Sequence, residues 1–416
     1  MKQLSSAGDL IGLIPAGATV IVHSGCGEPL AYTDALAAEA DRLEDVTIIT
    51  MMPMGRSPYG DVQSPNVKVE TFFPGRGLRK AAERGDVRLR RHDLRDLPSL
   101  FETGQIKADL LLLQLSDPDA EGRHSLGVSL DYMPAVLAQE PLVAALINPA
   151  YPRVGGSGWV TPHKIDFALE ASAPVQTIVS DETEDEASQL IADHLASLVR
   201  DGDVLQLGIG ALPDAVARRL DHCRDLGIHS GIVTDAIVPL IEAGVITNAE
   251  KAEHRGRCVA TMAGGSELFY RYLHDHPGFS FQPCSYTHDL HVLTAIPRLT
   301  AINSALEVDL EGRVNAETLD GRLVSSVGGL ANFARGASHA PGGRSIIALR
   351  ATSRGGETSR VRTRLDPRKR ATLEPDETDI VVTEFGIAHL TGTSAADRKR
   401  ALAAISHPEF RRELGR

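Results

Sequence analysis

The sequence predicts an α/β protein of two tandem open α/β domains with mainly parallel sheets. Short runs of leucine or β-branched residues alternate along the chain with alanine-rich segments of helical spacing, which is the pattern of this fold class. The runs are almost continuously apolar, as expected for parallel strands covered on both faces. With 416 residues, 42% of them apolar, the chain is too long for one small core.

Four buried strands are expected in the first half, at residues 20–22, 46–49, 110–113 and 142–147. The alanine-rich segment 33–43 between the first two is expected to be helical. In the second half, strands are expected at residues 345–349 and 379–382.

The boundary between the domains is expected near residue 180, giving domains at 1–180 and 181–416. The sequence Ala-Ser-Ala-Pro at 171–174 precedes an acidic run at 181–186. After it, one face of an amphipathic helix is formed by Ala187, Leu190, Ile191, His194, Leu195 and Leu198. Acidic residues in the first turn of a helix suit the positive end of its dipole, so the run marks a helix start rather than a functional patch.

The two halves resemble one another at one point. Residues 17–29 and 202–213 each contain a turn, a short strand, Gly-x-Gly and then a proline that enters an alanine-rich helix. This indicates two similar halves. In open α/β sheets, ligands bind beyond the carboxyl ends of the strands, which is where these glycines are predicted to lie.

Composition excludes several classes of function. The formal net charge of −12 argues against general nucleic-acid binding, although local arginines and helix N-termini can still hold an anionic ligand. The four scattered cysteines lack metal or disulfide spacing, and the 15 histidines show no zinc motif, so no metal is expected. The amino terminus lacks the features of a secretion signal, and the longest apolar run is far too short to cross a bilayer. We therefore expect a cytoplasmic protein that does not bind membranes.

Residues 206–215, Gln-Leu-Gly-Ile-Gly-Ala-Leu-Pro-Asp-Ala, carry the strongest local signal. Glycines between a strand and a helix let the backbone approach a ligand, and their N–H groups can bind an anion or an oxyanion. Pro213 stands where a dinucleotide fingerprint requires a third glycine, and no Walker A motif occurs. Tight packing of the strand against the helix is the alternative explanation.

Four further features bear on function, and three of them have two interpretations each. The loop 325–337 contains Gly328 and Gly329, which suit either a ligand or a turn. The basic tract 354–370 suits either phosphate binding or an exposed hairpin. Ser157 fails the nucleophile-elbow pattern because Trp159 replaces its second glycine. Glu384, at the end of a strand, is either a catalytic acid or a carboxylate that caps the next helix or pairs with an arginine.

Taken together, these segments resemble the acetyl-CoA hydrolase/CoA-transferase family, in particular its 4-hydroxybutyrate and butyrate CoA-transferases. The similar segments in the second half are residues 206–215, 227–235, 241–246, 264–269, 302–309, 327–337 and 383–392. The first half is similar more weakly, at residues 28–29, 98–100, 115–118 and 127–132.

The resemblance implies two NagB-like domains, with coenzyme A bound as substrate or product mainly by the second and with no metal. By position, the loop that meets the thioester end of coenzyme A consists of Gly208, Ile209, Gly210, Ala211 and Leu212. Gly328 and Gly329 lie on a second coenzyme-binding loop, and Arg350 and Ala351 approach the coenzyme. A short carboxylic acid is the implied second ligand, and a homodimer or homotetramer the implied assembly.

Gly231 stands where the transferases of the family carry a catalytic glutamate, after His-Ser or His-Thr. That glutamate attacks acyl-CoA and carries the coenzyme as a covalent thioester. Leu330 and Asn332 also replace a glutamine and an aspartate common in the family. The segments that bind the coenzyme are therefore kept, while the residues around the reacting centre are changed.

Three hypotheses follow. In the first, which we prefer, water cleaves a short-chain acyl-CoA thioester, or a carbon–carbon bond of a CoA ester, beside the vacated position 231. His229 and Asp235 are the nearest candidates for the base; Glu307 and Glu384 are more remote. In the second, a displaced carboxylate or a direct reaction transfers CoA between acids. In the third, the protein binds CoA without catalysis.

Overall fold

The computed structural model describes residues 1–178, 185–319, 322–323, 328–353, 355–366 and 371–415. These form two compact units, residues 1–179 with 259–286, and residues 180–258 with 287–416. Parts of three segments singled out in the sequence lie outside the described residues. They are residues 181–184 of the acidic run, 324–327 of the second glycine loop, and 354 and 367–370 of the basic tract.

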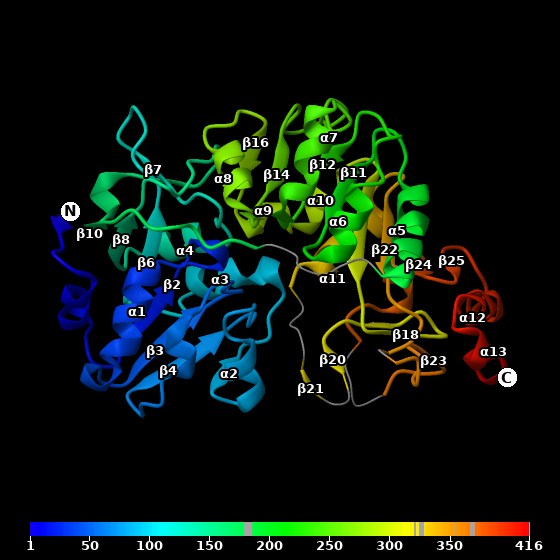
Figure 1. Cartoon of the computed structure of the whole chain (residues 1–416), viewed down its shortest axis with the longest axis horizontal. Helices are drawn as coiled ribbons and strands as arrows, with labels where there is room; N and C mark the ends of the chain where they lie inside the picture. Colours follow the sequence, from blue (N-terminus) through cyan, green and yellow to red (C-terminus); the bar gives the residue numbers. More distant parts are fainter. Residues whose placement is uncertain (179–184, 320–321, 324–327, 354, 367–370, 416) are drawn as a thin grey trace. The chain divides into compact units, whose positions relative to one another are not determined.

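The first unit is built on an eight-stranded sheet in which every neighbouring pair is parallel. In spatial order its strands are β1 (Lys2–Gln3), β10 (Phe167–Glu170), β8 (Leu142–Ile147), β6 (Leu110–Leu115), β2 (Thr19–Val22), β3 (Val46–Thr50), β4 (Val67–Thr71) and β5 (Val87–Leu89). All six residues of β6 are buried, so both faces of the sheet are covered there (Figure 1). The four strands predicted in the first half are confirmed.

Helices of the first unit are α1 (Leu30–Ala38), α2 (Arg79–Arg84), α3 (Leu97–Glu102), α4 (Met133–Ala138) and α8 (Glu267–Leu273). The helix expected at 33–43 starts earlier and is shorter: Pro29 is its N-cap, and residues 40–42 form a separate 3-10 turn. A proline suits this place because the first residues of a helix donate no intrahelical bond.

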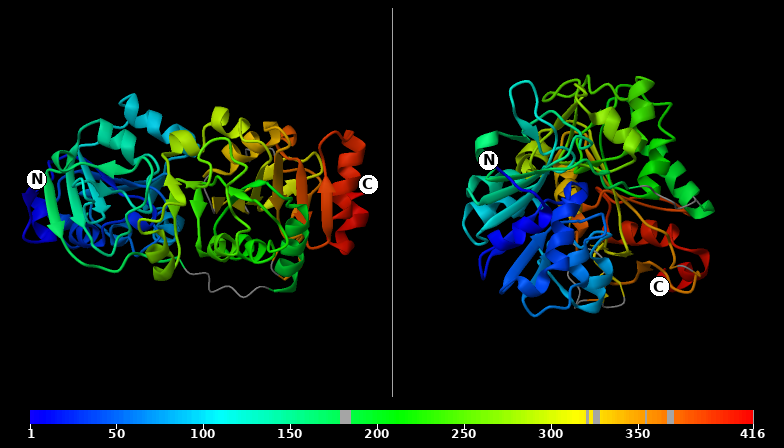
Figure 2. Two further views of the ribbon diagram at one scale, coloured as in Figure 1. Left: turned by 90° about the horizontal axis from the view of Figure 1, so that it is seen from above. Right: turned by 60° about the vertical axis from the view of Figure 1, so that its left-hand side comes forward.

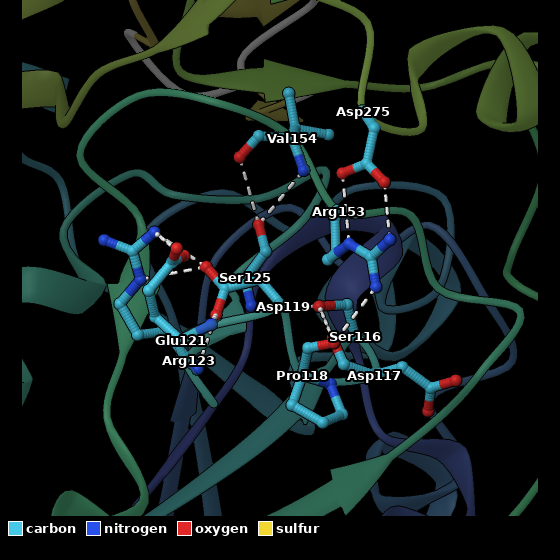
Figure 3. A network of polar contacts seen from close by, with 10 residues as sticks. All are labelled: Ser116, Asp117, Pro118, Asp119, Glu121, Arg123, Ser125, Arg153, Val154 and Asp275. Atoms are coloured by element: carbon cyan, nitrogen blue, oxygen red, sulfur yellow. Dashed lines mark hydrogen bonds and ion pairs between the residues drawn. The ribbon is translucent and has the colours of Figure 1, made fainter.

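Residues 259–286 belong with the first unit although they follow its last strand by almost ninety residues. They contain β15 (Met262–Ala263), β16 (Phe279–Phe281) and α8, and β14 (Cys258–Ala260) begins at their edge. Leu130 donates its N–H to the carbonyl of Thr261 at 2.9 Å. Arg153 pairs with Asp275, with 3.0 Å between Nε and Oδ1, beside the loop that also holds Asp119 and Arg123 (Figure 3). These bonds attach the segment to the loops beyond β6 and β8.

The second unit contains a six-stranded sheet that is parallel except at its last pair. In order its strands are β12 (Gly227–Ile228), β11 (Val204–Leu207), β17 (Leu299–Ser304), β22 (Arg344–Ala348), β24 (Ile380–Thr383) and β25 (Gly386–His389). The strands predicted at 345–349 and 379–382 are β22 and β24. The fold prediction of α/β units with mainly parallel sheets is confirmed.

Its helices are α5 (Glu186–Leu198), α6 (Ala211–Ala217), α7 (Val238–Glu242), α10 (Leu290–Thr294), α11 (Leu330–His339), α12 (Ala395–Ala404) and α13 (Pro408–Leu414). The amphipathic helix predicted after the acidic run is α5, capped by Asp185, which accepts a bond from the Ser188 N–H. Helices α12 and α13 lie beside the edge strand β25 (Figure 2), and Leu402 and Leu414 enter the core there.

Two small sheets follow β17. One has the order β19 (Val314–Asn315), β18 (Glu307–Asp309) and β23 (Val361–Arg362), and the other pairs β20 (Thr318–Leu319) with β21 (Arg322–Leu323). Among the described residues, no helix has the length and hydropathy that a membrane crossing requires. The four cysteines are buried and form no disulfide.

Candidate functional site

The carboxyl end of β11 is followed directly by Gly208 and Gly210, and Gly210 is the N-cap of α6. Gly210 has φ +116°, a conformation that favours glycine. A Cβ added to Gly210 would meet no atom within 4 Å, and one added to Gly208 would meet only Pro213 Cγ, at 3.9 Å. Tight packing therefore does not explain these glycines. They leave the backbone open to an approaching ligand.

The corresponding glycines of the first unit behave differently. A Cβ at Gly25 would lie 2.3 Å from Cε of Met262, and one at Gly27 would lie 2.8 Å from the ring of His23. In that loop the glycines are required by packing. The two Gly-x-Gly segments that look alike in the sequence thus have different surroundings, and only the second leaves space for a ligand.

A small pocket lies beside the open loop of the second unit. Its lining is mostly apolar: Leu207, Gly208, Pro213, Ile228, Ser230, Ile232, Val233, Thr234, Ala236 and Ile237. The cavity volume of about 10 Å³ is roughly what one water molecule needs. The pocket therefore joins the Gly-x-Gly loop to the segment on either side of Gly231.

His229 and Ser230 are buried and bind the main chain. Nε2 of His229 lies 3.1 Å from the carbonyl oxygen of Thr287, and the hydroxyl of Ser230 donates to the carbonyl of Leu207 at 2.9 Å. Burial lowers the pKa of His229 to about 3, so its ring is neutral at neutral pH. Both side chains therefore hold the backbone just after the end of β12. A role of His229 as base stays a prediction.

Gly231 faces a histidine that the sequence analysis did not single out. A Cβ at position 231 would lie 3.0 Å from Nε2 of His288, 3.2 Å from its Cε1 and 3.5 Å from Cε2 of Phe333. The space in front of position 231 is therefore filled by these two rings. No local motif marks His288, which lies between the short helix α9 (Cys284–Thr287) and Asp289, the N-cap of α10.

Gly329 approaches the same histidine from another loop. It is the N-cap of α11, and a Cβ there would lie 2.5 Å from Nε2 of His288. Gly328 before it has φ +55°, which again favours glycine. Within the first turn of α11, Asn332 is fully buried, and neither polar atom of its side chain has a hydrogen-bonding partner among the described residues. The structure thus brings Gly231 and Gly329, 98 positions apart in sequence, to one side chain.

Three other predicted residues form a separate group at the ends of β22 and β24. The guanidinium of Arg350 binds both oxygens of Asp185, at 2.7 and 2.8 Å, and the hydroxyl of Ser188. Ala351 donates its N–H to Oε2 of Glu384 at 2.9 Å. A role of Glu384 as a catalytic acid stays a prediction.

The remaining carboxylates occupy other surroundings. Asp235 begins a 3-10 turn and is half-buried. The pKa of Asp214 is raised mainly by the burial of Asp214 itself, and the negative charge of Asp235 adds to this effect. Both oxygens of Glu307 are engaged, by Arg362 at 2.8 Å and by Asn315 at 2.9 Å. In the described part of the chain, no group of three or more histidine, cysteine or acidic side chains is arranged to hold a metal ion.

The family of this chain follows from a comparison with known protein families. The chain matches the acetyl-CoA hydrolase/transferase N-terminal domain over residues 1–183 and the C-terminal domain over residues 265–416. The chain belongs to the acetyl-CoA hydrolase/transferase family. The resemblance derived from the sequence segments is thereby confirmed.

Both activities of the acetyl-CoA hydrolase/transferase family occur among the chain's relatives. The 4-hydroxybutyrate coenzyme A transferase of Clostridium kluyveri is 34% identical over 414 residues, 99% of this chain and 96% of that protein. The acetyl-CoA hydrolase of Kluyveromyces lactis is 27% identical over 285 residues, 60% of this chain and 49% of that protein. The crystal structure of RipA from Yersinia pestis, 31% identical, superposes with a TM-score of 0.92, covering 99% of this chain and 96% of that one.

Membership makes this chain an enzyme of the acyl-CoA hydrolase/transferase class. Its relatives are named for reactions of CoA thioesters. The possible roles considered for Gly208, Gly210, Gly231 and Gly329 are therefore roles in such a reaction.

Proposed function

We propose that this enzyme hydrolyses a short-chain acyl-CoA thioester, giving the free acid and coenzyme A. The observation that carries the proposal is the surroundings of position 231. The family resemblance assigns the covalent carrier to this position, but the residue is glycine and the space before it holds the rings of His288 and Phe333. A covalent carrier carboxylate has neither a side chain nor room there, so water is the natural acceptor of the acyl group.

The coenzyme is proposed to bind along the open loop after β11 and the start of α11. A Cβ at Gly208 or Gly210 would meet no atom closer than 3.9 Å, so the loop has open space beside it, and its backbone N–H groups are proposed to face the thioester oxygen. Such donors stabilise the oxyanion that forms when a thioester carbonyl is attacked, and removing one donor of this kind typically slows a reaction by about 10²–10³-fold. Gly329, at the N-cap of α11, supplies a second approach of the backbone to the coenzyme.

Hydrolysis proceeds by addition and elimination. Water adds to the thioester carbonyl carbon as it loses a proton to a base, and the carbonyl oxygen becomes an oxyanion held by the loop amides. Collapse of this intermediate breaks the carbon–sulfur bond. The thiolate of coenzyme A then takes up the proton, and the acid leaves. No covalent enzyme intermediate is formed.

Transfer of CoA to a second carboxylic acid is the alternative, and the relatives favour it. The similarity to the Clostridium kluyveri transferase spans 99% of this chain, whereas the similarity to the Kluyveromyces lactis hydrolase spans 60%. This alternative requires a carrier carboxylate elsewhere or a direct reaction between two bound ligands.

The two functions are separated by following free thiol. The purified protein is incubated with acetyl-, propionyl-, butyryl- and 4-hydroxybutyryl-CoA, each with and without acetate or succinate. Hydrolysis releases thiol at a rate independent of the added acid. Exchange of the acyl group only when an acid is present, without net thiol release, would contradict hydrolysis and establish transfer. Binding of CoA with neither reaction would leave the non-catalytic hypothesis.

Restoring a carboxylate at position 231 tests the positional assignment. Because a Cβ there lies 3.0 Å from His288 Nε2, Gly231→Glu needs room, and His288→Ala provides it. The double variant is expected to gain acceptor-dependent exchange of CoA that Gly231→Glu alone shows weakly and Gly231→Ala lacks. Failure of the double variant, when correctly folded and able to bind CoA, would contradict the assignment of position 231.

A further inference from the structure

The small pocket of the second unit adjoins the open loop that follows β11. Gly208 of this loop lines the pocket, and so does Pro213 of α6, whose Cγ would lie 3.9 Å from a Cβ at Gly208. Strand β12 (Figure 1), residues 232–234 and the 3-10 turn Asp235–Ile237 supply most of the remaining lining. The pocket therefore lies beside the place where the thioester is proposed to react.

The pocket has a buried floor and a half-buried rim. The floor consists of the buried lining residues, which are Leu207, Ile228, Ser230, Val233 and Ile237. The rim consists of the half-buried ones, which are Gly208, Pro213, Ile232, Thr234 and Ala236. A ligand group can therefore enter at the rim and lose its contact with water at the floor. The cavity volume of about 10 Å³ limits what enters to one small group.

The chemistry of the lining favours an apolar group. Ser230 donates its hydroxyl hydrogen to the carbonyl of Leu207 at 2.9 Å. Thr234 donates its own to Oδ1 of Asp214 at 3.2 Å. The other lining residues carry no polar side chain. A buried water needs about two to four polar partners, whereas a methyl group needs none. The pocket therefore suits the methyl end of an aliphatic chain better than a water, a hydroxyl or a carboxylate.

The floor is held in place on both sides of Ile228. On one side β12 pairs with β11, and the N–H of His229 donates to the carbonyl of Leu205 at 3.1 Å. On the other side β12 is at the edge of the sheet, and two buried side chains take the place of a strand. Asn248 accepts the N–H of Ile228 through Oδ1, and Lys251 donates from Nζ to the carbonyl of Ile228, both at 2.8 Å. A backbone fixed in this way resists widening, so one added methylene is felt.

We propose that this pocket binds the terminal methyl group of the acyl chain and so selects short, saturated, unbranched acyl-CoA thioesters. The inference rests on the proposed function, which places the thioester beside the loop of Gly208 and Gly210. A chain that ends at the floor buries its last carbon, and a longer or branched chain has no room there. A chain that ends in a hydroxyl or a carboxylate loses hydrogen bonds to water that the lining does not replace. Ala236 on the rim and Ile237 on the floor set the accepted length.

The experiment changes the size of the pocket in two directions. Ala236→Val adds carbon atoms at the rim and makes the pocket smaller, whereas Ile237→Val removes one from the floor and makes it larger. Ile346→Val is the matched control, because Ile346 is also buried but lies in β22 and does not line the pocket. For each protein, kcat/KM of thiol release is measured with acetyl-, propionyl-, butyryl-, pentanoyl- and hexanoyl-CoA, and with 4-hydroxybutyryl- and succinyl-CoA. Circular dichroism reports whether each variant is folded.

One methylene in an apolar pocket typically changes kcat/KM by about 10–200-fold. We expect the wild type to prefer butyryl-CoA to 4-hydroxybutyryl-CoA and to succinyl-CoA. The ratio of kcat/KM for shorter to longer chains should rise by about tenfold in Ala236→Val, fall in Ile237→Val and stay constant in the control. A constant ratio in both folded pocket variants, or a wild type that prefers the chains with polar ends, would overturn the proposal. So would an equal change for every acyl-CoA, since the pocket would then hold part of the coenzyme itself.

Binding of S-alkyl-CoA thioethers, which cannot be hydrolysed, separates this inference from the proposed function. Calorimetry with S-ethyl-, S-propyl-, S-butyl- and S-pentyl-CoA should show binding that tightens by about fourfold for each carbon that leaves water, until the pocket is full. Ala236→Val should shorten the chain at which this gain ends. A wild type that shows the gain but releases no thiol from any acyl-CoA contradicts hydrolysis and leaves the pocket standing. A wild type that hydrolyses acyl-CoA, with chain-length profiles that neither variant changes, contradicts the pocket alone.

Discussion

Replacing Gly329 by alanine is expected to destabilise the protein while His288 is present and to be tolerated once His288 is alanine. The new Cβ would lie 2.5 Å from Nε2 and 2.8 Å from Cδ2 of the histidine. Ordinary contact begins near 3.4 Å, so the overlap with Nε2 is about 0.9 Å. At Gly231 the corresponding 3.0 Å separation gives an overlap of about 0.4 Å, and alanine there should cost much less.

Overlaps of this kind force side chains or backbone to shift and typically cost about 1–3 kcal/mol. Two smaller effects accompany the change to alanine. A reduced entropy of the unfolded chain stabilises by about 0.4–1 kcal/mol, and loss of glycine at the N-cap of α11 opposes it. Both effects are the same whether residue 288 is histidine or alanine, so a double-mutant cycle removes them and leaves a coupling of about 1–3 kcal/mol.

The cycle consists of the wild type, Gly329→Ala, His288→Ala and the double variant. Thermal unfolding is followed at one pH, where 1 kcal/mol corresponds to a change in Tm of roughly 2–4 °C for a unit of this size. A parallel cycle with Gly231→Ala should give a smaller coupling. If Gly329→Ala shifted Tm equally in both backgrounds, His288 would not occupy the space between the two glycines.

Other variants test individual contacts. Burial raises the pKa of the Glu28 carboxyl from 4.5 to about 7. The folded state is therefore stabilised by the protonated carboxyl below about pH 4.5, and this stabilisation is lost as the pH rises through 7. Glu28→Gln should reduce the resulting fall in Tm between these pH values. Asp185→Ala removes the cap of α5 and the ion pair with Arg350, and should cost about 0.5–2 kcal/mol in urea unfolding. Lys251→Met leaves the carbonyls of Ile228 and Arg257 without their donor, and a cost of about 1–3 kcal/mol is expected in the same assay.

Much of the fold could be predicted because its strands are marked locally. The run of leucines that begins β6 is buried along its whole length, and burial on both faces needs an uninterrupted apolar run whatever the partner strands are. The start of α5 could also be predicted from the sequence. Acidic residues precede the apolar face of an amphipathic helix there, and an acidic N-cap accepts bonds from the first N–H groups of a helix. The family could be identified because several such segments recur in a fixed order.

The candidate site could be predicted only in part. The Gly-x-Gly sequence suggests a loop that binds a ligand, but it reads alike in both units, and only the atoms around Gly25 and Gly210 distinguish packing from open space. Glu384 is a candidate because it ends a strand, and Arg350 because of the family resemblance, whereas the structure pairs them with Ala351 and Asp185. Position in the sequence does not reveal which partner is nearest in space.

The sequence by itself determined the α/β class, the family and the absence of a carboxylate at position 231. Only the tertiary structure decided what fills that absence: His288, which comes between Gly231 and Gly329 because α10 packs on α11. The physical reason is that periodicity and capping act within a few residues of the chain. A contact among positions 231, 288 and 329 exists only after the sheet and its helices have closed around it.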